Sequence, residues 1–378
     1  MDNIWLASAV WIGLALAASL ISIWAAISVA LIEIMVGAVA GNIIGLPLSP
    51  WVNYLAGFGA ILLTFLAGTE VDADVVRRNF GASVGVGVVS FLTPYLGCLL
   101  AARYMLGWSW PEAQIAGIAL STTSVAVVYA VMVETGLNKT ELGKIILAAC
   151  FITDLGTVLA LGIVFANFNI WLLGFAAATV VAAWLLPMYA PWFFAKVGQR
   201  VSEPQAKFVL LVLFLLGGIA TSVGSEAVLP AYIVGMVLAP AFQNEHELAH
   251  RMRVMAFAIL TPFYFLKAGS LIEFKTLVAG AGLIALFLGL KMLTKFVGIL
   301  PLTRAFRFKR RDGIYTTLLM STGLTFGSIS ALYGLTNKII DQRQYTILLT
   351  AVIGSAVVPT LIAQKWFLPK IGVAKQEV

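Results

Sequence analysis

The sequence has few charged residues and almost no cysteine, and each shortage excludes a class of protein. Charged residues make up 11% of the 378 residues and hydrophobic residues 61%, whereas soluble globular domains average about 25% and about 45–50%. The mean hydropathy of +0.99 excludes a water-soluble domain and favours lipid as the surrounding of most of the surface. The two cysteines, Cys98 and Cys150, lie in apolar runs, which excludes a disulfide framework and a cysteine-rich metal site.

Histidine is also scarce, and no cofactor motif is present. His246 and His250 stand four residues apart in one polar segment. We interpret this segment as a solvated loop rather than a metal site. The net charge of +7 comes from basic residues in short breaks between apolar runs, which is typical of membrane topology and not of a nucleic-acid-binding face. We therefore expect no enzyme, no cofactor and no nucleic-acid partner.

Apolar stretches of membrane-spanning length follow one another along the chain. A hydrocarbon core of about 30 Å requires a helix of roughly 20 residues, and about 13 such spans are predicted, the shortest near 226–241. The expected spans are 3–22, 25–46, 52–69, 80–103, 112–133, 143–166, 170–190, 206–223, 226–241, 254–271, 277–300, 314–334 and 344–364.

The distribution of lysine and arginine orients these spans. Three basic residues fall within spans, namely Lys267, Lys291 and Lys295. With the N-terminus outside, the external loops contain only Arg103, Lys275, Lys338 and Arg343, and all other basic residues are cytoplasmic. The positive-inside rule thus predicts an external N-terminus and a cytoplasmic C-terminus, and we expect an integral protein of the bacterial inner membrane.

The chain resembles itself at an offset of about 200 residues. Leu120-Ser121-Thr122 recurs as Met320-Ser321-Thr322, and Phe65-Leu66-Ala67-Gly68 recurs near 265–269 with one insertion. The matching units begin an odd number of spans apart, so we expect inverted repeats over about 25–167 and 226–364, with a linker helix at about 170–190. Inverted repeats are typical of secondary transporters, whose binding site lies at mid-membrane depth. The chain then forms a single transporter unit, residues 1–378.

Two polar clusters occupy equivalent places in these repeats. Ser121, Thr122, Thr123 and Ser124 stand in mid-span, and Ser321, Thr322 and Thr325 form the second cluster. Hydroxyl side chains in an intact membrane helix often bond to their own backbone or to a neighbouring helix. Because two clusters recur at matching positions, we predict two broken helices that cross at mid-membrane and supply backbone groups to an ion.

Asp154 is the deepest carboxylate and the best candidate for the ion-binding group. A charge at the bilayer centre costs about 2.5–3.5 kcal/mol even on the lenient insertion scale, so an acid there requires a reason. Protonation removes that cost, which makes Asp154 a candidate proton carrier, and the neighbouring Thr153 is a further candidate to bind the ion through its hydroxyl oxygen, with Ser121, Thr122 and Thr123. Lys291 and Lys295 share a helix face in the eleventh span and are candidates to neutralise Asp154 or the half-helix ends. Glu33, in the second span, is a candidate gating residue.

Several segments carry a family resemblance in their order and spacing. They are Ile32–Ala38, Leu63–Asp72, Leu120–Val127, Leu142–Leu147, Thr153-Asp154 and Lys295–Gly298. With these segments the chain resembles the second branch of monovalent cation:proton antiporters, which contains bacterial Na⁺/H⁺ and Kef-like K⁺/H⁺ antiporters, over nearly its whole length.

The resemblance implies an all-α fold with a six-helix core domain, two of whose helices are broken and crossed, beside a dimerisation domain. It implies a homodimer in the lipid bilayer, with Asp154 matching the essential second aspartate and Lys295 the conserved membrane lysine. In this chain Thr153 stands where the family usually has Asp or Asn. A pair of acids is therefore absent, which favours an electroneutral cycle and leaves both Na⁺ and K⁺ as cations.

Three functions remain open on the sequence. The leading hypothesis is an antiporter in which H⁺ and Na⁺ or K⁺ compete for Asp154. A passive monovalent cation channel of the same fold is a second hypothesis, and an organic-anion symporter of a related inverted-repeat fold is a third, because half-helix N-termini attract anions. Vesicle flux separates the first two, since only an antiporter couples cation movement to an imposed pH gradient.

Overall fold

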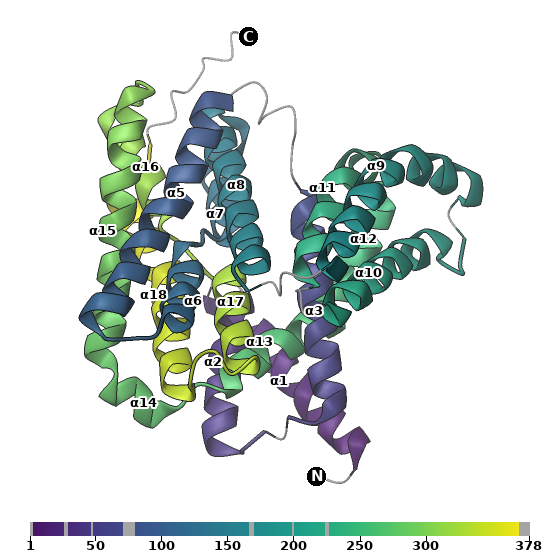
Figure 1. Cartoon of the computed structure of the whole chain (residues 1–378), viewed down its shortest axis with the longest axis horizontal. Helices are drawn as coiled ribbons and strands as arrows, with labels where there is room; N and C mark the ends of the chain where they lie inside the picture. Colours follow the sequence, from purple (N-terminus) through teal and green to yellow (C-terminus); the bar gives the residue numbers. More distant parts are fainter. Residues whose placement is uncertain are drawn as a thin grey trace. The chain divides into compact units, whose positions relative to one another are not determined.

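The computed structural model describes residues 3–25, 29–46, 48–70, 80–165, 170–198, 200–223 and 227–369, and this part of the chain is helical without strands. Nine of the described helices are long and apolar enough to cross a membrane. A helix satisfies all its backbone hydrogen bonds within one segment, which lipid requires. The chain is an integral membrane protein of the all-α class (Figure 1).

Every expected span overlaps one helix or several helices in succession, and the expected number of 13 membrane crossings stays a prediction. The main departure lies at His246 and His250, where the expected loop is wrong because residues His246–Met255 form a helix, α12. Leu248 and Met252 lie one turn apart on that helix, and both are completely buried. Their burial stabilises a helix in an otherwise polar segment, as an amphipathic pattern of this spacing allows.

The chain divides into two compact units, and each combines segments from both halves of the sequence. The first unit contains residues 1–72 and 158–276, and the second contains residues 73–157 and 277–378. The helices of the first unit are α1 (Ile4–Ala25), α2 (Val29–Ile43), α3 (Pro50–Thr69), α9 (Ile170–Val197), α10 (Pro204–Ser222), α11 (Val228–Asn244), α12, the π-helix η3 (Ala256–Leu260) and α13 (Thr261–Ser270).

The second unit contains the remaining elements. They are α5 (Phe80–Leu100), the π-helix η1 (Ala101–Met105), α6 (Trp110–Ser121), α7 (Val125–Glu134), the 3-10 helix η2 (Leu137–Lys139), most of α8 (Glu141–Val164), α15 (Ala281–Ala305), α16 (Arg310–Met320), α17 (Thr325–Thr336) and α18 (Gln342–Trp366), with α14 (Phe274–Ala279) at the division.

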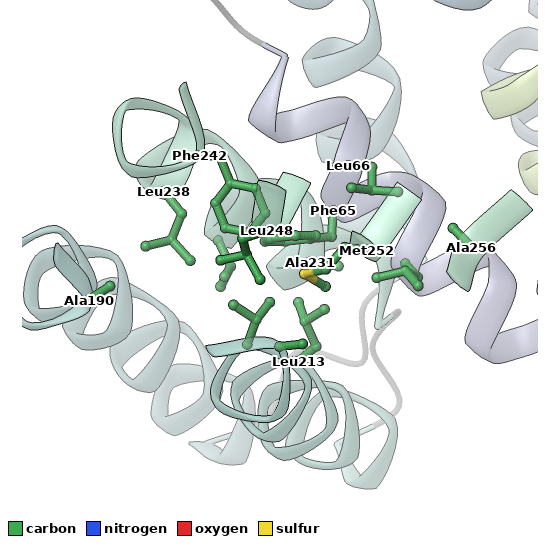
Figure 2. Packing of buried hydrophobic residues seen from close by; sticks show 14 of the residues in the cluster. Phe65, Leu66, Ala190, Leu213, Ala231, Leu238, Phe242, Leu248, Met252 and Ala256 are labelled. Atoms are coloured by element: carbon green, nitrogen blue, oxygen red, sulfur yellow. The ribbon is translucent and has the colours of Figure 1, made fainter. Parts of the chain in front are cut away.

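Two close helix pairs organise the first unit, α2 with α13 and α3 with α11. A Cβ atom at Gly37 would overlap the backbone of Leu266, and one at Gly235 would overlap the backbone of Phe65. Glycines at such positions let helix backbones approach closely, which strengthens packing where no water drives association. Around α10, α11 and α12, Phe65, Phe242, Leu248 and other apolar side chains form a continuous core (Figure 2).

The second unit has its own close pair, α5 with α15. A Cβ atom at Gly97 would overlap Thr294, and one at Gly298 would overlap Thr93. The two contacts have the same residue types, and Thr93 and Gly97 on α5 precede Thr294 and Gly298 on α15 by the same number of residues, so the contacts are equivalent under exchange of the two helices. The expected repeat boundaries, the linker helix and the dimerisation role of one domain stay predictions.

Candidate ion-binding site

Two interrupted helices lie in the second unit, where the polar clusters predicted them. Helix α6 ends at Ser121, residues 122–124 are non-helical, and α7 begins at Val125. Thr122 is extended, with φ −62° and ψ 156°. The second interruption leaves 321–324 non-helical, because α16 ends at Met320 and Thr325 is the first residue of α17. Each interruption frees carbonyl groups at one helix end and N–H groups at the next.

The interruptions contact each other directly. Thr123 Oγ1 donates a hydrogen bond to Met320 O over 2.9 Å, and Ser124 N donates to Thr322 Oγ1 over 3.3 Å. Helix α6 also packs against α17, and Figure 1 shows these two labelled helices in the same part of the unit. Six of the seven hydroxyl residues predicted here are fully buried or nearly so around this contact, namely Ser121, Thr122, Thr123, Ser124, Ser321 and Thr322.

Four of these hydroxyl groups bond to their own helix. Ser121 Oγ donates to Ile118 O over 2.8 Å and Thr122 Oγ1 to Ala119 O over 3.2 Å. Ser321 and Thr322 donate to Thr317 O and Leu319 O in the same way. Back-bonding and helix interruption were alternatives on the sequence. The structure contains both, because the back-bonds lie at the helix ends that precede each interruption.

Lys295 reaches the C-terminal end of α6. Its side chain is completely buried, and Nζ donates to Ser121 O over 2.9 Å and to Thr122 O over 3.5 Å. The same nitrogen lies 2.7 Å from Ser90 Oγ and 3.1 Å from Thr123 Oγ1. An ammonium group at a helix C-terminus opposes the negative end of the helix dipole. These bonds compensate a charge that would otherwise be costly to bury.

Lys291 occupies a second buried position, one turn earlier on α15. Its Nζ donates to Ser355 Oγ over 2.9 Å. Ser355 Oγ in turn lies 2.7 Å from Val352 O and 3.5 Å from Gly323 O, at the second interruption. The two lysines therefore point to different interruptions, Lys295 to the first and Lys291 to the second.

Asp154 is 98% buried in α8, and its Oδ1 has no hydrogen-bond partner among the described residues. No lysine or arginine in that part of the chain forms an ion pair with this carboxylate within 4.0 Å. A buried polar atom without a partner costs about 1–3 kcal/mol, and more for a charged group. The free oxygen marks a position where a proton or a cation would be stabilised.

Thr153 and Glu33 have other surroundings. Thr153 Oγ1 lies 3.0 Å from Ala149 O and 3.1 Å from Gly87 O, so its hydroxyl proton is directed to backbone and ties α8 to α5. Glu33 is 2% exposed on α2, in the first unit. Its gating role, like the direct role of Thr153 in ion binding, stays a prediction.

The sequence alone did not indicate Ser90, Ser355 or Gly323. Single serines and glycines are common in membrane helices, so only their position beside the lysines distinguishes them. A signal was nevertheless present, because Ser355 and Asp154 hold equivalent positions on the last helix of each predicted repeat. No cluster of three or more histidine, cysteine or acidic residues able to hold a metal occurs in the described ranges.

Curated relatives resemble this chain over most of its length. It is 27% identical over 345 residues to the probable Na⁺/H⁺ antiporter 3 of Methanocaldococcus jannaschii, which covers 86% of this chain and 88% of that protein. It is 22% identical over 340 residues to the Na⁺/H⁺-K⁺ antiporter GerN of Bacillus cereus, with 83% and 84% coverage. These relatives are transporters and not enzymes.

A solved structure and a family profile agree with this likeness. The sodium proton antiporter MjNhaP1 from Methanocaldococcus jannaschii, determined at pH 8, superposes with a TM-score of 0.71 over 96% of this chain and 98% of that chain, at 16% identity. The fold is therefore that of this antiporter. The profile described as "Sodium/hydrogen exchanger, transmembrane" matches residues 8–367, and the chain belongs to this sodium/hydrogen exchanger family.

Proposed function

We propose that the protein is a secondary antiporter that exchanges H⁺ for a monovalent cation, Na⁺ or K⁺, at Asp154. The observation that carries the proposal is the buried Asp154 carboxylate, whose Oδ1 has no hydrogen-bond partner in the described part of the chain. Family membership supports proton-coupled cation exchange in general. The names of the relatives support Na⁺, and the name of GerN supports K⁺ as a further cation.

Competition follows from the cost of burying an unpaired charge. With neither a proton nor a cation bound, the ionised carboxylate stands in a low-dielectric site where no lysine or arginine of the described residues forms an ion pair with it, which is strongly unfavourable. Binding of either species removes that penalty, but the two cannot use the same oxygen at once. The loaded site then crosses to the other side by alternating access, and the empty ionised site crosses rarely.

The proposed cycle exchanges one H⁺ for one cation and moves no net charge. Thr153 leaves Asp154 as the only acid of the usual pair, so one carboxylate supplies one proton. Lys295 remains charged, because Ser90, Ser121 O and Thr123 hold its ammonium group with several hydrogen bonds. In the alternative cycle, Lys295 releases a second proton in each turn and transport becomes electrogenic.

The direct test is exchange in proteoliposomes with Na⁺, K⁺ and Li⁺ at several pH values. An imposed pH gradient should drive uptake of at least one of these cations, and raising the proton concentration should raise the cation concentration needed for half-maximal rate. Cation flux that carries current without proton counter-flow would identify a channel and contradict the proposal. Repeating the flux measurement with only impermeant anions on both sides of the membrane tests organic-anion symport, because a symporter requires an anion that it can carry.

We further propose an external N-terminus, a cytoplasmic C-terminus, the bacterial inner membrane and a homodimer. The basic residues support this orientation, since they concentrate from the last turn of α15 to the first turn of α16, namely Arg304, Arg307 and Lys309–Arg311. A cysteine introduced at Lys338 should react with an impermeant maleimide from outside intact cells. A cysteine introduced at Lys309 should react only after permeabilisation. The opposite pattern would reverse the orientation.

A further inference from the structure

The surroundings of Lys291 correspond residue by residue to those of the Asp154 site. On α5 and α15, the paired contacts Gly97–Thr294 and Gly298–Thr93 fix the correspondence of the two helices. Ser90 and Lys291 are separated by the same number of residues as Thr93 and Thr294. Lys291 therefore takes the position on α15 that Ser90 takes on α5.

The other two helices of the site correspond in the same way. Thr153 on α8 contacts Gly87 O on α5, and Gly354 on α18 lies against Leu288 on α15. Gly87 precedes Leu288 by the same number of residues as Thr153 precedes Gly354, so the two contacts match. The next residues on α8 and α18 are Asp154 and Ser355. At the interruptions, Ser121 matches Ser321, and hence Thr123 matches Gly323.

Two half-sites result, and they have different chemistry. We call Ser90, Thr123 and Asp154 the acidic half-site, and Lys291, Gly323 and Ser355 the lysine half-site. In the acidic half-site Ser90 Oγ lies 3.4 Å from Thr123 Oγ1, and Lys295 Nζ contacts both hydroxyl groups, so the exchangeable ion is assigned to the unpartnered Asp154 Oδ1. In the lysine half-site a Cβ atom at Gly323 would overlap Lys291 Nζ and lie 3.2 Å from Ser355 Oγ. Glycine here makes the room that the ammonium group fills.

We infer that Lys291 is a tethered cation that permanently fills the counterpart of the Asp154 site, so that the chain has one exchangeable cation site and not two. This inference rests on the proposed function and deepens it. A lysine ammonium is a monovalent cation with three donors, and here it donates to the Ser355 hydroxyl oxygen, which lies 3.5 Å from Gly323 O in the second interruption. Such oxygens also solvate Na⁺ or K⁺. A covalently attached cation cannot exchange, so its half-site requires no titrating acid, and Ser355 stands where the other half-site has Asp154.

The inference predicts that the lysine half-site becomes exchangeable when it receives the residues of the acidic one. The double variant Lys291→Ser/Ser355→Asp should bind about two Na⁺ per chain in detergent, where the unmodified protein binds about one, with each site saturating separately. Equilibrium binding of radiolabelled Na⁺ gives the count. Lys275→Ser, an exposed lysine on α14, is the matched control and should still bind one.

The outcomes separate the inference from the proposed function. If the unmodified protein binds neither Na⁺ nor K⁺ in competition with protons, the proposed function fails. If it binds one Na⁺ and the folded double variant also binds one, the tethered-cation inference alone is overturned.

A second variant keeps the inference testable if the double variant does not fold. In Lys291→Ala the space of the ammonium group is vacant, and methylammonium should raise the melting temperature by several degrees more than it does for the unmodified protein. Tetramethylammonium, which has no N–H donor, should give no such difference. Equal shifts with both ions, or no extra shift with methylammonium, would overturn the inference.

Discussion

Helices α6 and α16, which precede the two interruptions of the second unit, differ at both ends. Their N-termini are capped differently, and their C-termini lie beside different half-sites. Helix α6 begins with a capping box, in which Ser109 and Glu112 satisfy each other's backbone N–H groups, and ends beside Lys295 and the acidic half-site. Helix α16 begins after Lys309 with no side-chain cap and ends beside the lysine half-site. Similar backbone paths therefore carry different chemistry at both ends.

The unlike N-termini show a conflict between two requirements on the same positions. Lys309 corresponds to Ser109, and Asp312 corresponds to Glu112, so α16 has the acidic partner of a capping box without the cap. Lysine and arginine at a helix N-terminus oppose the helix dipole. In the proposed topology, however, these residues lie on the cytoplasmic side, where positive charge fixes orientation. In the proposed topology the requirement for orientation outweighs the loss of the cap, since a missing cap costs about 1 kcal/mol.

The largest effects are expected from substituting one side chain in each half-site, Asp154 in the acidic half-site and Ser355 in the lysine half-site. Asp154→Asn should reduce exchange to background, because the amide keeps the shape of the side chain and loses the titrating group. Ser355→Ala should retain measurable exchange, since no exchangeable ion is proposed there. Proteoliposome flux measures both, and Asp341→Asn, which keeps an N-cap residue on α18, controls for the substitution type. Exchange by Asp154→Asn at the normal rate would remove the proposed site.

Lys295 provides the next largest effect. Lys295→Met should lower the exchange rate tenfold or more, because Ser121 O and Thr122 O lose the ammonium group that compensates the end of α6. The buried carbonyls that lose a donor also destabilise the fold by about 1–3 kcal/mol. Measuring ion flux and denaturant-induced unfolding on the same preparation separates the loss of exchange rate from the loss of stability. A variant with unchanged rate and unchanged stability would show that the first interruption does not depend on this charge.

Thr153 tests the stoichiometry. Solid-supported-membrane electrophysiology should detect no sustained charge displacement with the unmodified protein. Thr153→Asp restores a second acid next to Asp154 and should produce a charge displacement on cation addition. Thr157→Asp, one turn further along α8, is the matched control. A clear current from the unmodified protein, matched to proton flux, would instead indicate that Lys295 releases a proton in each cycle.

Gly323 tests the packing of the lysine half-site. Gly323→Ala should destabilise the protein by about 1–3 kcal/mol, the usual cost of overpacking, because the added methyl group would overlap Lys291 Nζ. Gly282→Ala on α15 has no heavy atom within 4 Å of the new methyl group and should not destabilise. Equal unfolding free energies for the two variants would mean that the ammonium group has room to move aside.

The smallest expected effect concerns the missing cap. Lys309→Ser should complete a capping box with Asp312 and stabilise α16 by about 0.5–1 kcal/mol, whereas Ser109→Ala should destabilise α6 by about 1 kcal/mol. Thermal unfolding measures both changes. If neither variant shifts the unfolding temperature, capping does not contribute to the difference between these helices.

Much of the fold was predictable because lipid imposes simple rules on sequence. The spans follow from apolar length, and the interruptions at 122–124 and 321–324 follow from serine and threonine clusters within those spans. Helix α12 was not predictable in this way, since the burial of Leu248 and Met252 depends on partners elsewhere in the chain. The side chains of Asp154, Lys291 and Lys295 were identifiable because charged residues are rare inside membranes.

The sequence by itself determined the helical class, the spans, the positions of the interruptions and the identity of the buried charges, since each depends on local composition. Only the tertiary structure decided how the lysines are divided between the interruptions, with Lys295 at Ser121 O and Lys291 at Ser355. Two residues one turn apart on a helix share a face, but their long side chains reach different partners. That choice is set by the glycine contacts between α5 and α15 and by the space at Gly323, which involve residues far apart in the chain.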